Sequence, residues 1–272
     1  MNSIRIYHIL IWLIVGIIFS LLVIKDQSIH ARLGNPSELT GYCLLGTMIF
    51  LALFNIRKRL SMLPMIGKAS TWLILHTAGG FFVLAVFWLH TKTIWPTGMY
   101  EKSLAILFYL TVTSGIIGYL IQQIYPKLLT QTGVEVIFER IPHHISKLRQ
   151  KAEEMILKCC DKNGIETLGK HYLDTLQWFF AKPRFTFQHL IGSQRSQQWI
   201  QHQDNAVRRY LNKDEQKYLN ELSQLAYQKN IIDIHYTLQG AMKCWLLIHI
   251  PLTSALMLLS FWHFLVVNVY AL

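Results

Sequence analysis

Residues 71–90 read TWLILHTAGGFFVLAVFWLH, and residues 241–267 read AMKCWLLIHIPLTSALMLLSFWHFLVV. Both stretches are apolar over about twenty residues, the length of helix that crosses the roughly 30 Å hydrocarbon core of a bilayer. Each contains two histidines fourteen residues apart: His76 and His90 in the first, His249 and His263 in the second. Fourteen helical residues return to within about 40° of the starting direction and rise about 21 Å. The two imidazoles of each helix therefore lie on one face, at two depths.

The composition of the whole chain is typical of a membrane protein. Of its 272 residues, 52% are hydrophobic and 15% are charged, whereas soluble proteins average about 25% charged residues. Three further apolar stretches, 5–24, 40–56 and 104–124, bring the predicted spans to five. The net charge of +11 comes without a nucleic-acid-binding motif, so we interpret it as a topology signal. The sequence predicts an all-α polytopic membrane bundle. We expect it to be surrounded by lipid and not to bind nucleic acid.

Polar residues divide the chain into residues 1–124 with four spans, an insert over 125–240, and residues 241–272 with the fifth span. The insert has 16 Lys and Arg and 12 Asp and Glu, with apolar residues at helical spacing. The loop between the second and third spans carries four basic residues and no acidic ones: Arg57, Lys58, Arg59 and Lys68. The positive-inside rule then predicts a cytoplasmic N-terminus, a helical cytoplasmic insert and an external C-terminus. We expect the protein in a bacterial inner membrane.

The histidine spacing predicts a cofactor. Spans 71–90 and 241–267 are separated by one crossing, so they run in the same direction. His76 then lies at the depth of His249, and His90 at the depth of His263. An imidazole in hydrocarbon is costly unless it faces a partner, and paired histidines are typical axial ligands of haem iron. We predict an inner and an outer b-type haem, with irons about 20 Å apart and no open position for oxygen. The alternative is that the histidines only form hydrogen bonds between helices.

Residues near the four histidines are expected to help bind the haems. Haem propionates need cations, and three lysines flank the histidines: Lys68 and Lys243 before the inner pair, and Lys92 after His90. Four glycines are predicted to let a flat macrocycle approach the backbone: Gly79, Gly80, Gly115 and Gly118. Two hydroxyls, those of Thr77 and Thr253, are predicted to form hydrogen bonds around the ligands. No C-x-x-C-H motif occurs, so covalent haem attachment is not expected.

The two His-x13-His helices resemble the di-haem transmembrane cytochromes b. This group includes the ferric-reductase-like transmembrane domains and the cytochrome b subunits of quinol-oxidising complexes. The resemblance covers the second to fifth spans and implies four helices around two b haems, with the four histidines as iron ligands. The sequence contains neither the Pro-Glu-Trp-Tyr quinol motif nor a G-x-G-x-x-G motif, P-loop or iron–sulfur cysteine cluster. The donor and acceptor are therefore expected to be other molecules.

We accordingly expect an electron-transfer subunit of a membrane oxidoreductase complex, with no catalytic residues of its own. Its expected partners are redox subunits such as a c-type cytochrome, an iron–sulfur protein or a flavoprotein, or a quinone. Two alternatives stay open from the sequence. One is a stand-alone transmembrane metal or quinone reductase, and the other is a non-redox helical membrane scaffold.

Overall fold

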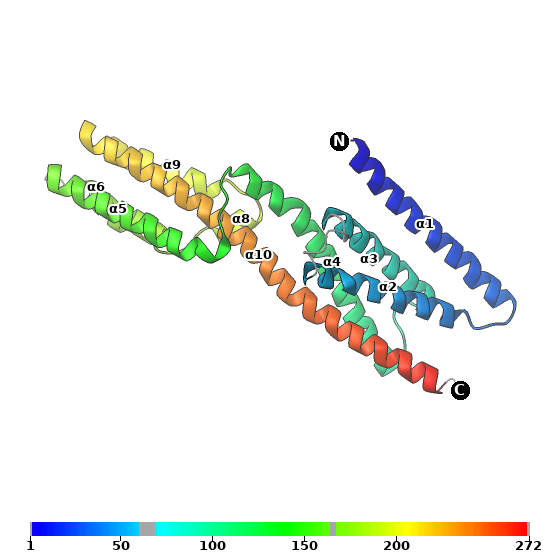
Figure 1. Cartoon of the computed structure of the whole chain (residues 1–272). Helices are drawn as coiled ribbons and strands as arrows, with labels where there is room; N and C mark the ends of the chain where they lie inside the picture. The colour runs from blue at the N-terminus through cyan, green and yellow to red at the C-terminus, as the bar shows by residue number, and fades with distance from the viewer. Residues whose placement is uncertain (1, 60–68, 164–166, 271–272) are drawn as a thin grey trace. The chain divides into compact units, whose positions relative to one another are not determined.

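The computed structural model describes residues 2–59, 69–163 and 167–270. Within these ranges the chain is helical, with turns between the helices and no β-strand (Figure 1). It divides into two compact units. The first, here the membrane unit, comprises Met1–Tyr119 and Leu246–Leu272, and the second, the insert unit, comprises Leu120–Trp245. The insert was predicted to extend from 125 to 240.

Within the described ranges, five helices are long and apolar enough to cross a membrane. They are α1 (Asn2–Ala31), α2 (Pro36–Arg59), α3 (Ala69–Thr91), α4 (Met99–Gln131) and α10 (Lys213–Tyr270). Each contains one of the five predicted spans, so the all-α class and the number of candidate spans are confirmed for the described residues. Helix α10 begins well before its apolar part, and both α4 and α10 contribute residues to both units.

Local sequence explains where the helices of the membrane unit begin and end. Asn35 precedes α2, and its side-chain oxygen accepts a hydrogen bond from the Ser37 backbone N–H at 3.2 Å. Pro36 occupies the first helical position, where its missing N–H costs nothing. Helix α3 ends at Thr91, and the next residue, Lys92, has a left-handed φ of 55° and an N–H that donates to Trp88 O at 3.1 Å.

Packing in the membrane unit joins four helices through one apolar core. Helices α1, α2 and α3 approach one another closely along their backbones. A buried cluster then connects α2, α3, α4 and α10; its members are Met48, Val83, Phe87, Ala105, Phe108 and Leu256. The rings of Phe87 and Phe108 are stacked with centroids 4.0 Å apart. Large apolar side chains such as Leu13 and Ile17 of α1 are exposed, as expected of a surface that faces lipid.

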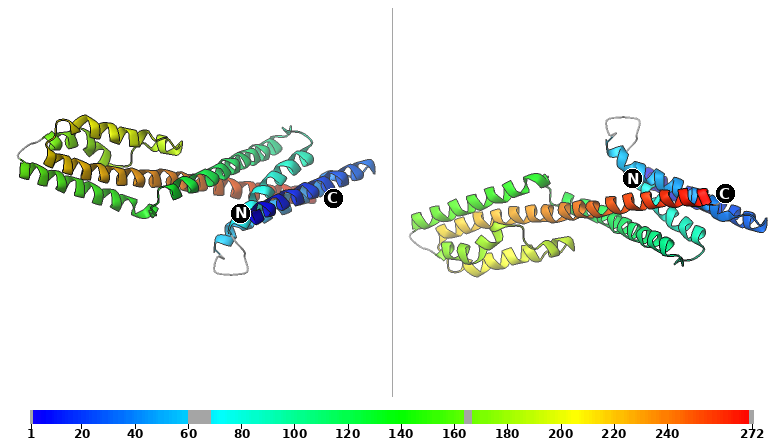
Figure 2. Two further views of the ribbon diagram at one scale, coloured as in Figure 1. Left: turned by 90° about the horizontal axis from the view of Figure 1, so that it is seen from above. Right: turned by 90° about the horizontal axis from the view of Figure 1, so that it is seen from below.

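The insert unit is a helical bundle with its own core. Besides the ends of α4 and α10, it contains α5 (Ile141–Asn163), α6 (Thr167–His171), the π-helical turn η3 (Tyr172–Leu176), α7 (Gln177–Ala181), α8 (Thr186–Leu190) and α9 (Arg195–Arg208), after a short 3₁₀ turn, η2 (Phe138–Arg140). The views in Figures 1 and 2 place α5 beside the first half of α10. The core contains Phe179, Phe180 and Leu222, all fully buried. The aromatic run before Lys182-Pro183 therefore supplies this core.

Candidate functional site

The four histidines of the two predicted pairs lie on two helices of the membrane unit. His76 and His90 are on α3, and His249 and His263 are on α10. The imidazoles of His76 and His249 are within range of electrostatic interaction with each other, and so are those of His90 and His263. The structure therefore brings these side chains together in two pairs, each with one member from either helix.

The inner pair, His76 and His249, is bounded by α2 and α4. On α4, Ser114 Oγ lies 3.2 Å from His249 Nδ1, and a Cβ built on Gly115 would lie 3.7 Å from His249 Cε1. On α2, the Phe54 ring lies 5.1 Å from the His76 ring between centroids. His76 Nδ1 is buried and has no hydrogen-bond partner among the described residues. One imidazole is thus held by a hydroxyl, and the other is packed against an aromatic ring.

The outer pair, His90 and His263, repeats this arrangement with the helices exchanged. On α2, Thr40 Oγ1 lies 3.1 Å from His90 Nδ1, and a Cβ built on Gly41 would lie 3.1 Å from His90 Cε1. On α4, the Tyr100 ring is stacked on the His263 ring with centroids 5.9 Å apart. His263 Nδ1 is buried without a hydrogen-bond partner in the described part of the chain. At the outer pair the hydroxyl comes from α2 and faces α3, and the aromatic ring comes from α4 and faces α10. At the inner pair the hydroxyl comes from α4 and faces α10, and the aromatic ring comes from α2 and faces α3.

Sequence reasoning missed the two hydroxyls that contact the histidines. The hydroxyls it named, those of Thr77 and Thr253, donate to Leu73 O and Ile250 O of their own helices, both at 2.8 Å. A signal was nevertheless present in the sequence. Within the five predicted spans, a hydroxyl residue is followed directly by glycine at two places, Thr40-Gly41 and Ser114-Gly115. These are the dipeptides that face His90 and His249.

Of the four glycines predicted to give room for a macrocycle, one faces an imidazole and the others lie in different surroundings. Gly115 faces an imidazole, as described above. A Cβ on Gly79 would lie 2.7 Å from Leu51 Cδ2, so this glycine permits the close approach of α2 to α3. A Cβ on Gly80 would meet no heavy atom within 4 Å among the described residues. Gly118 is buried within α4.

Two of the three lysines predicted to bind haem propionates, Lys92 and Lys243, lie within the described residues, and both already have carboxylate partners. Lys92 Nζ lies 2.7 Å from Asp26 Oδ2, and the Asp26 side chain is 7% exposed. Lys243 forms an ion pair with Glu139, and its Nζ lies 4.0 Å from the centroid of the Phe138 ring. Lys68 lies outside the described residues. A role of Lys92 or Lys243 in binding a propionate would require each ammonium to share or exchange its present partner.

The two imidazole pairs supply the ligand type and number that bis-imidazole coordination requires. Helices α3 and α10 make at most isolated close backbone approaches along their described lengths, so the two pairs are formed by side chains that reach across from each helix. No group of three or more His, Cys, Asp or Glu side chains converges among the described residues. A bis-histidine haem would need only two protein ligands, and each imidazole pair would supply two. The orphaned Nδ1 atoms and the imidazoles cradled by glycine fit such a group.

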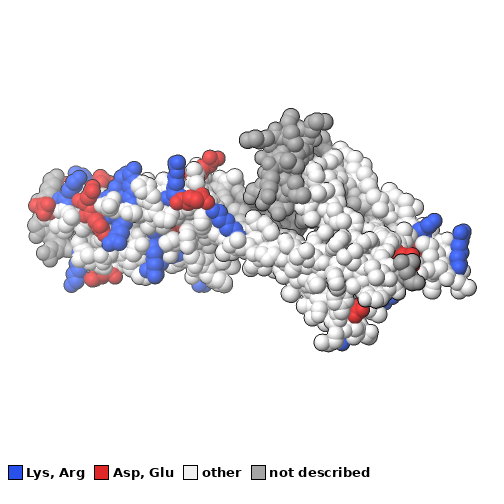
Figure 3. All heavy atoms as spheres, turned by 60° about the horizontal axis from the view of Figure 1, so that its bottom comes forward, with Lys and Arg blue, Asp and Glu red and all other residues white. Residues whose placement is uncertain are grey.

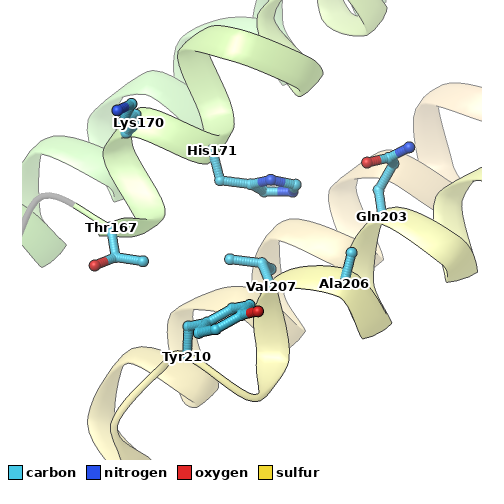
Figure 4. A pocket seen from close by; sticks show the side chains of 7 residues that line it. All are labelled: Thr167, Lys170, His171, Gln203, Ala206, Val207 and Tyr210. Carbon is cyan, nitrogen blue, oxygen red and sulfur yellow. The ribbon is translucent and has the colours of Figure 1, made fainter.

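A separate depression lies on the insert unit. It has a volume of about 510 Å³ and is lined by α6, α9 and the turn that follows α9 (Figure 4). The ring of His171 extends from α6 toward Gln203 and Val207 of α9. Burial lowers the pKa of the His171 imidazole, and its Nε2 has no hydrogen-bond partner within the described ranges. The depression is open and holds one imidazole, which does not define a binding chemistry.

Comparison with known proteins gives no independent identification. No protein-family model matches the chain, and neither the curated proteins nor the solved structures contain a match. The functional interpretation therefore depends on the four histidines and the residues that surround them.

Proposed function

We propose that this chain is a di-haem b membrane subunit that transfers electrons across the bilayer between partner redox proteins or a quinone. The proposal is carried by one observation. Two imidazole pairs span α3 and α10, and their members are fourteen residues apart on each helix. His76 and His249 would hold the inner haem, and His90 and His263 the outer one. Haem, when bound, supplies a one-electron redox centre.

The surroundings of the histidines support this assignment. His90 and His249 each have Nδ1 within hydrogen-bond distance of a hydroxyl, and we assign Nε2 of each ring as the atom that would bind the metal. His76 and His263 each bury an Nδ1 atom without a hydrogen-bond partner among the described residues. A metal bond at such a ring offsets the cost of keeping an imidazole in hydrocarbon. Six-coordinate iron with two histidines favours electron transfer over ligand activation.

The proposal includes an orientation in a bacterial inner membrane. The excess of Lys and Arg lies in the loops on the same side of the membrane as the N-terminus. It supports a cytoplasmic N-terminus and an external C-terminus. The insert, with 16 basic and 12 acidic residues over 125–240, would then be the cytoplasmic docking region for a partner. Figure 3 shows charged side chains crowded over this unit. A topology reporter fused after Leu272 should be active only outside the cytoplasm, and one inserted at Gly192 only inside it.

Optical redox titration of the purified full-length protein tests the cofactor assignment. We expect two low-spin b-type components that dithionite reduces, and no oxidation of NADH or NADPH by the chain alone. Protein produced with an adequate haem supply yet free of haem would overturn the proposal and favour a non-redox scaffold. Purification with its native partners would separate a subunit from a stand-alone reductase. Copurifying redox proteins support the first, and a metal or quinone reductase activity of the isolated chain supports the second.

A further inference from the structure

We infer that Thr40 is a positioning residue that fixes the tautomer and ring orientation of His90 and thereby selects Nε2 as the atom that binds the outer haem iron. This inference rests on the proposed function, because it concerns the ligand set of one of the two proposed haems. It assigns a role to a hydroxyl on α2, a helix that carries none of the four histidines.

The donors and acceptors around Thr40 define the direction of each hydrogen bond. Thr40 is fully buried, and its Oγ1 lies 3.2 Å from Pro36 O, 3.1 Å from Ser37 O and 3.1 Å from His90 Nδ1. A threonine hydroxyl has a single proton, whereas a carbonyl oxygen can only accept. The proton of Thr40 therefore points back to its own helix, as is common for threonine in helices. The remaining lone pairs of Oγ1 face His90.

The tautomer of His90 follows from this direction. With Thr40 as the acceptor, the contact is a hydrogen bond only if His90 Nδ1 carries a proton. A neutral imidazole protonated at Nδ1 has its lone pair at Nε2, and the neutral form is the one favoured within a membrane. Nε2 is thus left as the metal-binding atom. The hydroxyl also resists rotation of the ring about its bond to Cβ.

Gly41 complements this contact by leaving room for the ring. A Cβ at position 41 would lie 3.1 Å from His90 Cε1, closer than the roughly 3.5–4.0 Å of an optimal carbon–carbon contact. Cε1 lies between the two ring nitrogens, so an added methyl group would push the imidazole from the position in which it contacts Thr40. Thr40 and Gly41 therefore both set the position of the His90 ring. Thr40 forms a hydrogen bond with it, and Gly41 leaves the space that the ring occupies.

A hydrogen bond accepted from Nδ1–H makes the imidazole a stronger electron donor to iron. It stabilises ferric over ferrous iron and lowers the reduction potential of the haem. Loss of such a partner typically changes metal affinity about 10- to 100-fold. Thr40→Val keeps the shape of the side chain but removes its hydroxyl acceptor, and leaves the Ser37 carbonyl beside His90 in place. We expect the ferric-to-ferrous preference of the outer haem to fall about tenfold, which raises its midpoint potential by about 59 mV for a one-electron couple.

The test is redox titration and low-temperature electron paramagnetic resonance of full-length protein in detergent. Thr40→Val is compared with Thr40→Ser, which retains a hydroxyl, and with Thr47→Val, the matched control. Thr47 also lies on α2, and its hydroxyl donates to Cys43 O of the same helix at 2.8 Å. We expect a raised potential and an altered low-spin signal for the outer haem in Thr40→Val alone, with the inner haem unchanged. Loss of the outer haem in Thr40→Val alone would also support the inference.

The opposing outcomes separate this inference from the proposed function. Wild-type protein without haem overturns both. Two haems in the wild type, with the outer potential and signal of Thr40→Val equal to those of Thr47→Val, overturn the role of Thr40 alone. Equal loss of the outer haem in all three variants also overturns it, because a general packing defect of α2 would then explain the result.

Discussion

The membrane unit and the insert unit are built from the same kind of helix but are organised for different solvents. The insert unit places most of its charges at the surface (Figure 3) and buries a dense apolar core that includes Phe179 and Leu222. The membrane unit exposes apolar side chains such as Leu13 and Ile17 and brings four histidines of α3 and α10 together in two pairs. In the insert unit the buried polar groups include an ion pair, whereas in the membrane unit we propose that the paired imidazoles bind haem.

The buried ion pair of the insert unit illustrates the first case. Lys229 Nζ lies 2.6 Å from Asp233 Oδ2, and both side chains are 0% exposed. Lys229 also donates to Lys182 O at 2.8 Å, and Asp233 accepts from the Arg184 N–H at 3.2 Å. Burial lowers the pKa of Lys229 to about 8 and raises the pKa of Asp233 to about 6. Near pH 7 both groups are therefore charged and paired, which links two positions one turn apart on α10 to the chain around Lys182.

The largest effect is expected from the membrane histidines. His76→Ala and His249→Ala should each abolish the same inner haem, and His90→Ala and His263→Ala the same outer one, because six-coordinate iron loses a ligand in each case. Haem content and optical spectra of the four purified variants measure this. His202→Ala, on the exposed surface of the insert unit, is the control and should keep both haems. Two low-spin haems in every single variant would refute the pairing.

A smaller effect, confined to the insert unit, is expected from Lys229→Met. Removal of one partner leaves the Asp233 carboxylate buried and unpaired, which typically costs about 3–5 kcal/mol. Urea unfolding followed by hydrogen exchange of α5 and α9 amides measures the loss, while the haem spectrum should not change. Lys217→Met is the matched control on the same helix. Its pair with Asp214 is 76% and 64% exposed and contributes at most about 0.5 kcal/mol.

The double variant Lys229→Met with Asp233→Leu sharpens this test. It removes both charges together, so it should recover most of the stability lost in Lys229→Met. A double variant no more stable than Lys229→Met would show that the cavity left by the lysine, and not the unpaired carboxylate, causes the loss.

His189 should make the insert unit sensitive to acid. Its side chain is 3% exposed, and burial, with a contribution from Lys229, lowers its pKa from 6.5 to about 4. As pH falls from 6.5 to 4, the unfolded chain therefore binds this proton before the folded chain does, and stability declines. His189→Phe removes the group that takes up this proton. The free energy of unfolding of the variant minus that of wild type should therefore rise by about 3 kcal/mol as the pH falls from 7 to 4.

Urea unfolding at several pH values, read by exchange of α8 and α9 amides, checks this prediction. The difference between variant and wild type cancels most of the opposite contribution of Asp233, whose carboxyl gains a proton first in the folded state. His202→Phe, at an exposed position of α9, is the control for the added phenyl ring. A constant difference between His189→Phe and wild type from pH 7 to pH 4 would show that His189 is not protonated on unfolding in this range.

The smallest effect on the haems is expected from removing the insert itself. Thr132 Oγ1 lies 3.0 Å from His235 Nε2, so a short flexible linker can replace residues 130–235. All four histidines lie outside that range, and the two-haem spectrum should persist. Partner association should be lost, as measured by copurification. Persistent association would move the docking surface to the helices or outer loops, and loss of haem would show that the two units are not independent.

The sequence by itself determined the helices, the five candidate spans and the face on which each pair of histidines lies. These properties are local: helical periodicity aligns residues fourteen apart, a twenty-residue apolar run has the length of a bilayer core, and Asn35-Pro36 marks the start of α2 through its own hydrogen bonds.

Only the tertiary structure decided which groups meet across helices. It placed Thr40 and Ser114 against the imidazoles, where the sequence had favoured Thr77 and Thr253. It also gave Lys92 a partner in Asp26, 66 positions earlier in the chain. The reason is physical. A hydroxyl in a helix can donate to its own backbone or turn to a neighbour, and the choice depends on the rotation and depth of the adjacent helix, which periodicity within one helix does not specify.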